Sequence, residues 1–311
     1  MGIFLSNAAL ALLLLQSQAP PPAASADSLR AALWERVSAD STDGGAWLEL
    51  GRVYLQRGAD YHAHRKPTPV DTAFAHAILD TAQQAFERAA RLTTGTRTAD
   101  SARVYRIYTF GERAFVDWES AGQTAATLTW HSLPDGARLP PVLEELGENL
   151  LRACPHQGIL LTANETDTEA AWYLRFARGL RPDLVVVPMD RWRSDSMLRS
   201  RVLRDWKTRA ASLSALGQTR AVCASMGFER PPDERTVKWS KRPLVWLSGK
   251  ETKADRVPAQ DFVFAALRQA TDEHETWTAP VAAIYRRAAT NVPALCKAFD
   301  TFGLATELGC R

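Results

Sequence analysis

The most regular hydrophobic pattern of the chain lies between Gly158 and Pro188, where two short apolar runs flank an amphipathic stretch. Residues 159–162 and 184–187 are rich in Ile, Leu and Val, which is typical of strands buried on both faces. Between them, apolar positions continue as one helix to Arg178, before Gly179 and Pro182, which commonly end helices. A strand, a helix and a strand in about thirty residues predict a right-handed crossover in a parallel sheet.

A polar turn over residues 163–169 follows the first of these strands, which is where open parallel sheets place ligands. Candidate ligand-binding residues there are Asn164, Glu165, Asp167 and Thr168. Thr166 and Glu169 have the spacing of a capping box, which would be a structural role only. The three carboxyl groups of the turn would repel phosphate but would suit a cation or sugar hydroxyls. The turn therefore predicts either a helix cap alone or a cation or sugar site.

The first half of the chain has helical periodicity, with helices expected at residues 27–37 and 100–119. Between them, residues 47–54 match W-x₂-L-G-x₂-Y, and Ala82, Phe86 and Ala89 match A-x₃-F-x₂-A. Together these resemble a tetratricopeptide repeat, in which Gly51 would let the paired helices approach. The sequence differs from the pattern of that family in two ways, because residues 57–74 form an insertion and the closing proline is missing.

His62 and His64 lie one residue apart within this insertion. Two such histidines could share one face of a strand and bind a metal. A solvated loop is the preferred interpretation, so we assign no metal site.

The second half of the chain is expected to begin with a polar segment, residues 122–141, that holds a short strand at 128–131. Further helices are expected at 142–153, 197–216, 259–270 and 280–290. Residues 220–224 are expected to form either a short strand or the end of a helix. Further strands are expected at 244–247 after a charged loop at 231–242, and at 294–298 and 305–310. The expected fold is α/β, with a tetratricopeptide-like helical domain over 27–121 and a Rossmann-like three-layer domain over 122–311.

The segment from Gly158 to Pro188 also resembles the soluble C-terminal region of large bacterial multi-span membrane proteins related to protein O-mannosyltransferases. The matching positions are Asp167, Thr168, Trp172, Tyr173, Gly179, Arg181, Pro182 and Asp183. Glu165 and Thr166 depart from it, since that family has a Gly- or Asn-rich segment there. The resemblance implies the α/β fold and not glycosyl transfer, which would depend on membrane-spanning helices.

The N-terminal residues 1–26 predict a secretory signal peptide or a short N-terminal anchor. An apolar run from Ile3 to Leu15 precedes an A-x-A site that ends at Ala26. Export to the periplasm would give the four cysteines an oxidising environment, in which three pairings are possible. We prefer Cys296 with Cys310, because both are expected on neighbouring C-terminal strands.

The net charge of +3 gives no reason to expect nucleic-acid binding. Residues 191–256, however, hold 16 Lys and Arg against 7 Asp and Glu. This stretch predicts either an ordinary solvated basic face or a docking face for an acidic partner or an anionic membrane surface. Its candidate partner-binding residues are Arg199, Arg201, Arg204 and Lys207.

No pattern of catalytic or cofactor-binding residues is apparent, because the chain has no G-x-S-x-G and no Gly-rich phosphate loop. The sequence therefore predicts an exported, non-catalytic interaction or scaffold protein, an accessory subunit that docks on a membrane-embedded protein at the periplasmic face. The alternative is a sugar- or cation-binding domain, including a carbohydrate-related enzyme, that uses residues 164–169. A docking protein should expose a large apolar patch on its helical half, and a ligand binder should have a polar pocket at the strand ends.

Overall fold

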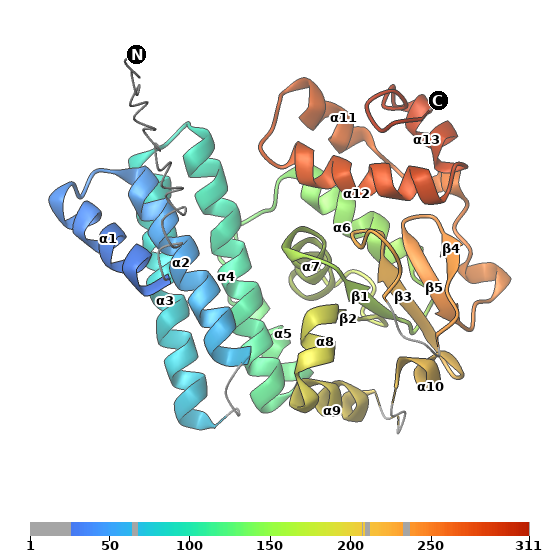
Figure 1. The fold of residues 1–311 in the computed structure, drawn as a ribbon, viewed down its shortest axis with the longest axis horizontal. Helices are drawn as coiled ribbons and strands as arrows, with labels where there is room; N and C mark the ends of the chain where they lie inside the picture. The colour runs from blue at the N-terminus through green and yellow to red at the C-terminus, as the bar shows by residue number, and fades with distance from the viewer. Residues whose placement is uncertain (1–25, 64–67, 207, 209–211, 233–236, 311) are drawn as a thin grey trace, which may run out of the picture.

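The computed structural model describes residues 26–63, 68–206, 208, 212–232 and 237–310 (Figure 1). Six helices form the first half of this part of the chain, and Figure 1 shows the first four side by side. Their bounds are α1 Ala26–Ala39, α2 Gly44–Ala63, α3 Pro69–Leu92, α4 Arg97–Ala121, α5 Gln123–His131 and α6 Pro141–Ala153. The predicted signal or anchor segment lies outside the described residues, apart from Ala26.

Helices α2 and α3 form the packed pair that the sequence predicts. A Cβ atom at Gly51 would lie 2.5 Å from the ring of Phe86, so only glycine allows this approach. The insertion between the two motifs is not a simple loop, because α2 continues to Ala63 and α3 already begins at Pro69. His62 is therefore part of α2, and His64 lies outside the described residues.

The predicted strand at 128–131 is wrong, because these residues belong to α5. Ala126 and Trp130, one helical turn apart, are both buried, and the Trp130 ring meets Tyr173 edge-on at 6.4 Å. Apolar and polar residues alternate from Leu128 to His131, which by itself is the pattern of a strand. When the buried Ala126 is included, the buried positions have the four-residue spacing of a helix instead.

Five strands form one mixed sheet in the order β2-β1-β3-β5-β4. Their bounds are β1 Ile159–Thr162, β2 Val185–Pro188, β3 Ala221–Ser225, β4 Ser240–Arg242 and β5 Val245–Gly249. The predicted parallel pairing of the first two strands is confirmed, since Leu160 lies opposite Val186. Strand β3 is also parallel to β1, but β5 and β4 are antiparallel additions. Strand β4 falls in the stretch predicted as a charged loop.

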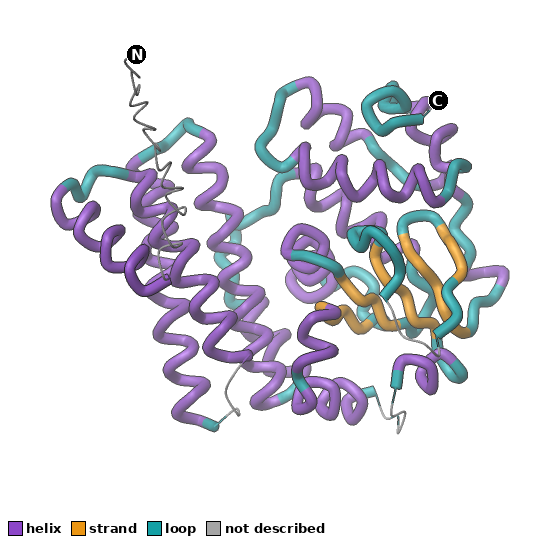
Figure 2. The backbone as a smooth tube through the Cα atoms, viewed as in Figure 1, coloured by secondary structure: helices purple, strands orange, loops and turns teal. Residues whose placement is uncertain are grey.

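The segments between the parallel strands are helical (Figure 2). Helix α7, Glu165–Trp172, continues as a π-helical turn, η1 Tyr173–Ala177, and leads to β2. Helices α8 Met189–Ser194, α9 Ser196–Asp205 and α10 Leu213–Gly217 lead from β2 to β3. The single helix predicted at 197–216 is therefore wrong: α9 ends at Asp205, and the hydroxyl of Ser212 caps a separate helix.

The C-terminal region is helical and irregular, with η2 Lys253–Asp255, η3 Ala259–Asp261, α11 Ala265–Asp272, α12 Thr278–Asn291 and α13 Leu295–Thr301. The helix predicted at 259–270 is thus divided between η3 and α11. The strands predicted at 294–298 and 305–310 are wrong. Leu295, Ala298 and Phe299 are buried at helical spacing, and Phe299 packs on Phe264 with ring centroids 4.6 Å apart.

Two disulfides join Cys154 to Cys223 and Cys296 to Cys310. The second is the preferred pair, but it links α13 to a terminal turn rather than two strands. Disulfides of this kind are typical of oxidising, extracytoplasmic compartments. Within the described ranges, none of the helices is both long and apolar enough to cross a bilayer.

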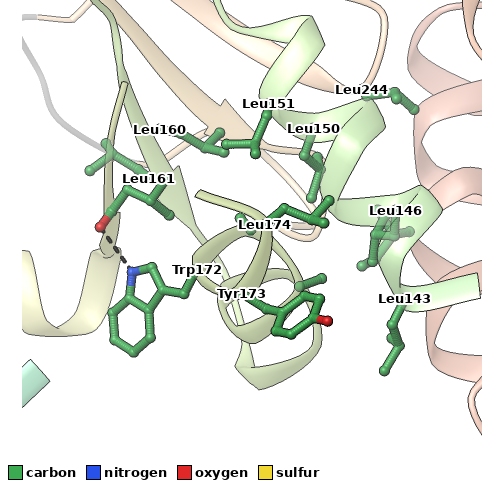
Figure 3. Close-up of a cluster of buried hydrophobic side chains, with 14 of the residues drawn as sticks. Leu143, Leu146, Leu150, Leu151, Leu160, Leu161, Trp172, Tyr173, Leu174 and Leu244 are labelled. Carbon is green, nitrogen blue, oxygen red and sulfur yellow. Dashed lines mark hydrogen bonds between the residues drawn. The ribbon is translucent and has the colours of Figure 1, made fainter. Parts of the chain in front are cut away.

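One hydrophobic core extends from Leu55 in α2 to Leu308 near the C-terminus. Figure 3 shows its centre, where leucines of α6 face β1 and the turn from α7 into η1. The approach of α6 to α7 requires Gly147, since a Cβ atom there would lie 2.7 Å from the carbonyl carbon of Ala170. The helical region therefore packs directly on the sheet region, and it forms one wall of the site described next.

Candidate functional site

The turn after β1 is held by a capping box, but its members differ from the predicted ones. The side chain of Asn164 accepts hydrogen bonds from the N–H groups of Thr166 and Asp167. The carboxylate of Asp167 in return accepts from the N–H groups of Ala163 and Asn164, at 3.0 Å and 2.8 Å. The predicted box of Thr166 and Glu169 is wrong, because the N-cap of α7 is Asn164, two residues earlier than that spacing requires.

Asp167 and Thr168 both form hydrogen bonds that hold this turn in place. Asp167 is fully buried, and it also bonds the side chain of Ser225 at the end of β3. Burial raises the pKa of Asp167, although these hydrogen bonds oppose the rise. The hydroxyls of Thr168 and Thr162 lie 2.7 Å apart. Asp167 therefore links the ends of β1 and β3, at the crevice where a doubly wound sheet commonly binds its ligand.

An open cleft lies beside this turn instead, between the carboxyl ends of β1 and β2 and the helices α2 and α4. Its volume is about 220 Å³. We call it the acidic cleft, after Glu112 of α4 and Glu165 and Glu169 of α7, and its lining also includes Tyr108 of α4 and Arg191 of α8.

Glu169 is the most unusual residue of the acidic cleft. Its side chain is 2% exposed, and its Oε2 atom has no hydrogen-bond partner among the described residues. Burial, together with Glu112 and Glu165, raises its pKa well above the ordinary range. Burial and the neighbouring carboxyl groups therefore both disfavour the charged form of Glu169.

Tyr108 has the same property, because its hydroxyl is buried and has no partner in the described part of the chain. Burial raises its pKa well above the ordinary value, with Glu165 and Glu169 adding to the effect. Glu165 is at the exposed mouth of the cleft. Desolvation by the surrounding helices and the charge of Glu112 raise its pKa, while Arg52 opposes the rise.

Arg191 is the buried cation of the acidic cleft and connects three elements. Its guanidinium donates to the carbonyl oxygen of Ala59 at 3.1 Å, lies 3.5 Å from Glu112 and stacks over the ring of Phe115. One buried guanidinium therefore pairs with one of the three carboxyl groups of the cleft, Glu112. The three carboxyl groups do not form a metal site, since no group of three or more acidic, His or Cys side chains in the described ranges is placed to hold an ion.

Of the predicted ligand-binding residues, Asn164, Glu165 and Thr168 line the acidic cleft, whereas Asp167 does not. Sequence reasoning missed Tyr108, Glu112 and Arg191. Tyr108 and Glu112 are one helical turn apart, but they lie in the predicted helix over 100–119, where nothing distinguishes them from other amphipathic positions.

Two of the predicted partner-binding arginines form hydrogen bonds with backbone carbonyl oxygens of this chain. Arg199 donates to carbonyl oxygens of Trp192 and Arg193, and Arg201 donates to those of Glu119 and Ser120 at the end of α4. The side chain of Arg204 is exposed. Lys207 lies outside the described residues.

The Arg-Pro-Asp segment of the sequence resemblance also has a local structural role. Arg181 forms a bidentate ion pair with Asp183 and donates to the carbonyl oxygen of Leu151 at the end of α6. Searches against models of protein families, curated proteins and solved structures found no match to this chain. The observed architecture is thus a helical region followed by a mixed five-stranded α/β region, with no family identified.

Proposed function

We propose that this chain is an exported binding protein that holds a small hydroxylated cation in the acidic cleft, an amino sugar being the simplest example. The observation that carries this proposal concerns two buried polar atoms, Oε2 of Glu169 and the hydroxyl oxygen of Tyr108. Neither has a hydrogen-bond partner among the described residues. Buried polar groups almost always have hydrogen-bond partners, and leaving one unpaired costs about 1–3 kcal/mol. A ligand in the cleft would supply these partners.

The charges of the cleft support a cationic ligand. Glu165 and Glu169 have raised pKa values partly because carboxylates repel one another, and an ammonium group between them would remove that cost. A phosphate would add to the repulsion. The hydroxyl of Tyr108 and the amide of Asn164 also line the cleft, and each can form hydrogen bonds with hydroxyl groups of a ligand. These two side chains therefore favour a hydroxylated ligand.

The size of the cleft supports a small ligand. A volume of about 220 Å³ is below the range of roughly 300–1,000 Å³ found for drug-sized ligands. A single sugar ring is of suitable size.

Isothermal titration calorimetry of the purified chain at pH 7 with glucosamine, glucose and putrescine tests the proposal. Glucosamine should bind at least about tenfold more tightly than glucose, because only glucosamine carries the ammonium group. Glu169→Gln and Tyr108→Phe should each weaken glucosamine binding, whereas Glu148→Gln should not, since Glu148 is exposed on α6 outside the cleft. Absence of binding by all three compounds, or equal weakening by Glu148→Gln, would contradict it.

The second candidate function is the exported scaffold that docks on a membrane-embedded protein, with α2 and α3 acting as a tetratricopeptide-like unit. Exposed apolar side chains on the helical region favour it: Leu29 is 46% exposed, Trp34 39% and Phe74 48%. Crosslinking in native membranes should then capture one stoichiometric partner, and Leu29→Ser with Trp34→Ser should abolish the capture. A chain that stays monomeric and uncrosslinked would oppose this function.

A further inference from the structure

A second cavity lies on the opposite side of α4 from the acidic cleft. Arg106 and Phe110, one turn apart on α4, line it, whereas Tyr108 and Glu112 line the acidic cleft. The other walls come from α3 and from the loop between α5 and α6. Its volume is about 560 Å³, well within the range of small-molecule sites.

The polar lining of this cavity is strongly basic. Four guanidinium groups line it, from Arg91, Arg103, Arg106 and Arg138, and we call it the basic pocket. Glu87 is the one carboxyl group among its lining residues, and it pairs with Arg106 at 3.0 Å. Arg103 pairs with Asp100, which lies outside the pocket lining.

Two of the four arginines have no carboxylate partner among the described residues. Neither Arg91 nor Arg138 forms an ion pair with a described residue, and both side chains are exposed at the rim. Arg106 is only partly satisfied, because its Nε atom is buried and has no hydrogen-bond partner there. A buried N–H without an acceptor is costly, and an oxyanion is the acceptor that a guanidinium binds best.

The floor of the basic pocket is apolar. Ile107 and Phe110 of α4 are 1% and 7% exposed, and Leu133 and Ala137 of the loop pack against the same core. A bare inorganic ion would leave this surface in contact with water. A ligand with an apolar group next to its charged group would cover it.

We propose that the basic pocket binds a small organic oxyanion, a carboxylate or phosphate attached to an apolar group. The guanidinium groups would hold the oxyanion, and the apolar group would lie on Ile107, Phe110 and Leu133. This site is independent of the acidic cleft, because the two share no lining residue.

Binding of phenyl phosphate, benzoate and inorganic phosphate by the whole chain tests the proposal, measured by calorimetry at constant ionic strength. Phenyl phosphate or benzoate should bind more tightly than inorganic phosphate, and whichever of the two binds more tightly identifies the oxyanion. Arg138→Gln should weaken that binding by about tenfold, the effect of losing one charge-assisted hydrogen bond. Arg138 is exposed, so this change does not threaten folding.

Two further variants make the outcome decisive. Arg106→Lys keeps a charge that can pair with Glu87 but removes the buried Nε group, and should also weaken binding. Arg204→Gln removes the same charge from an exposed position on α9 and should leave binding unchanged. The proposal is overturned if no probe binds, if inorganic phosphate binds as tightly as both aromatic probes, or if Arg204→Gln weakens binding as much as Arg138→Gln.

Discussion

The carboxyl group of Glu169 on α7 packs directly on the backbone of Gly111 on α4. A Cβ atom at position 111 would lie 2.9 Å from the Cδ atom of Glu169, nearer than real contacts allow. An alanine there would force the buried carboxyl group of Glu169 to move, although glycine is ordinarily unfavourable in a helix. The contact places a carboxyl group from the sheet region against a wall provided by the helical region.

Gly111→Ala should destabilise the chain by about 1–3 kcal/mol, the usual cost of overpacking. In an open helix the same substitution stabilises by about 1 kcal/mol, so the sign of the effect tests the contact. Urea denaturation measures it. Gly136→Ala is the matched control, because a Cβ atom there meets nothing within 4 Å, and should change the stability little. A more stable Gly111→Ala variant would mean that Glu169 does not pack on Gly111.

Stability should fall as the pH rises from about 4 to 8, and Glu145 should contribute to that fall. Its carboxylate accepts from the N–H groups of Ala266 and Leu267, yet burial raises its pKa from 4.5 to about 7. A raised pKa means that the folded state holds the proton more tightly, so stabilisation is present at low pH and is lost through pH 7. At about 1.4 kcal/mol per pKa unit, the loss is on the order of 3 kcal/mol.

Melting temperatures measured from pH 4 to 8 test the contribution of Glu145. Glu145→Gln should flatten the profile, because glutamine does not titrate. Glu148→Gln, on the exposed side of the same helix, should retain most of the wild-type slope, because the charge of Glu148 is the smallest of the causes that act on the pKa of Glu145. Equal slopes for wild type and Glu145→Gln would show that Glu145 does not titrate in this range.

Trp172→Phe should destabilise the chain by about 1–3 kcal/mol, because it leaves a buried carbonyl without a donor. The indole N–H of Trp172 donates to the carbonyl oxygen of Val186 at 3.0 Å, as the dashed line in Figure 3 marks. Val186 lies on β2, an edge strand, so the indole satisfies a backbone group that has no neighbouring strand. Phenylalanine can still stack on Phe115, so the variant removes mainly the hydrogen bond.

Hydrogen exchange distinguishes this explanation from a general loss of packing. In Trp172→Phe, amides of β2 should exchange faster while those of β5, on the far side of the sheet, keep their protection. Uniform loss of protection across the sheet would contradict the local role of the indole.

Removing the Cys154–Cys223 disulfide should cost more stability than removing Cys296–Cys310. The first spans 69 residues and the second spans 14, and closure of the longer loop restricts the unfolded chain more. The expected losses are about 4 and about 3 kcal/mol. Denaturation of the two paired Cys→Ala variants measures the difference. The reverse order would mean that native-state packing, rather than loop closure, dominates.

The local pattern of the sequence was sufficient for much of the fold. The strands β1 and β2 are continuous apolar runs, so their burial and parallel pairing follow from residues close together in sequence. Helices α1, α4 and α6 follow from their periodicity in the same way. The predictions for short segments were wrong, since Leu128–His131 and the stretch around Leu295 lie in helices and not in strands. For such short segments, packing partners elsewhere in the chain decide between helix and strand.

The sequence by itself therefore determined the strand–helix–strand unit, the acidic turn after β1 and the presence of four cysteines that can pair. Only the tertiary structure decided which acidic residues face a cleft. Asp167 turns inward to cap its own helix, while Glu165 and Glu169 meet Glu112 and Tyr108 of α4. The reason is physical, because the cleft and the basic pocket lie between helix faces that the shared core brings together. The local sequence does not determine which of these faces will pack against each other.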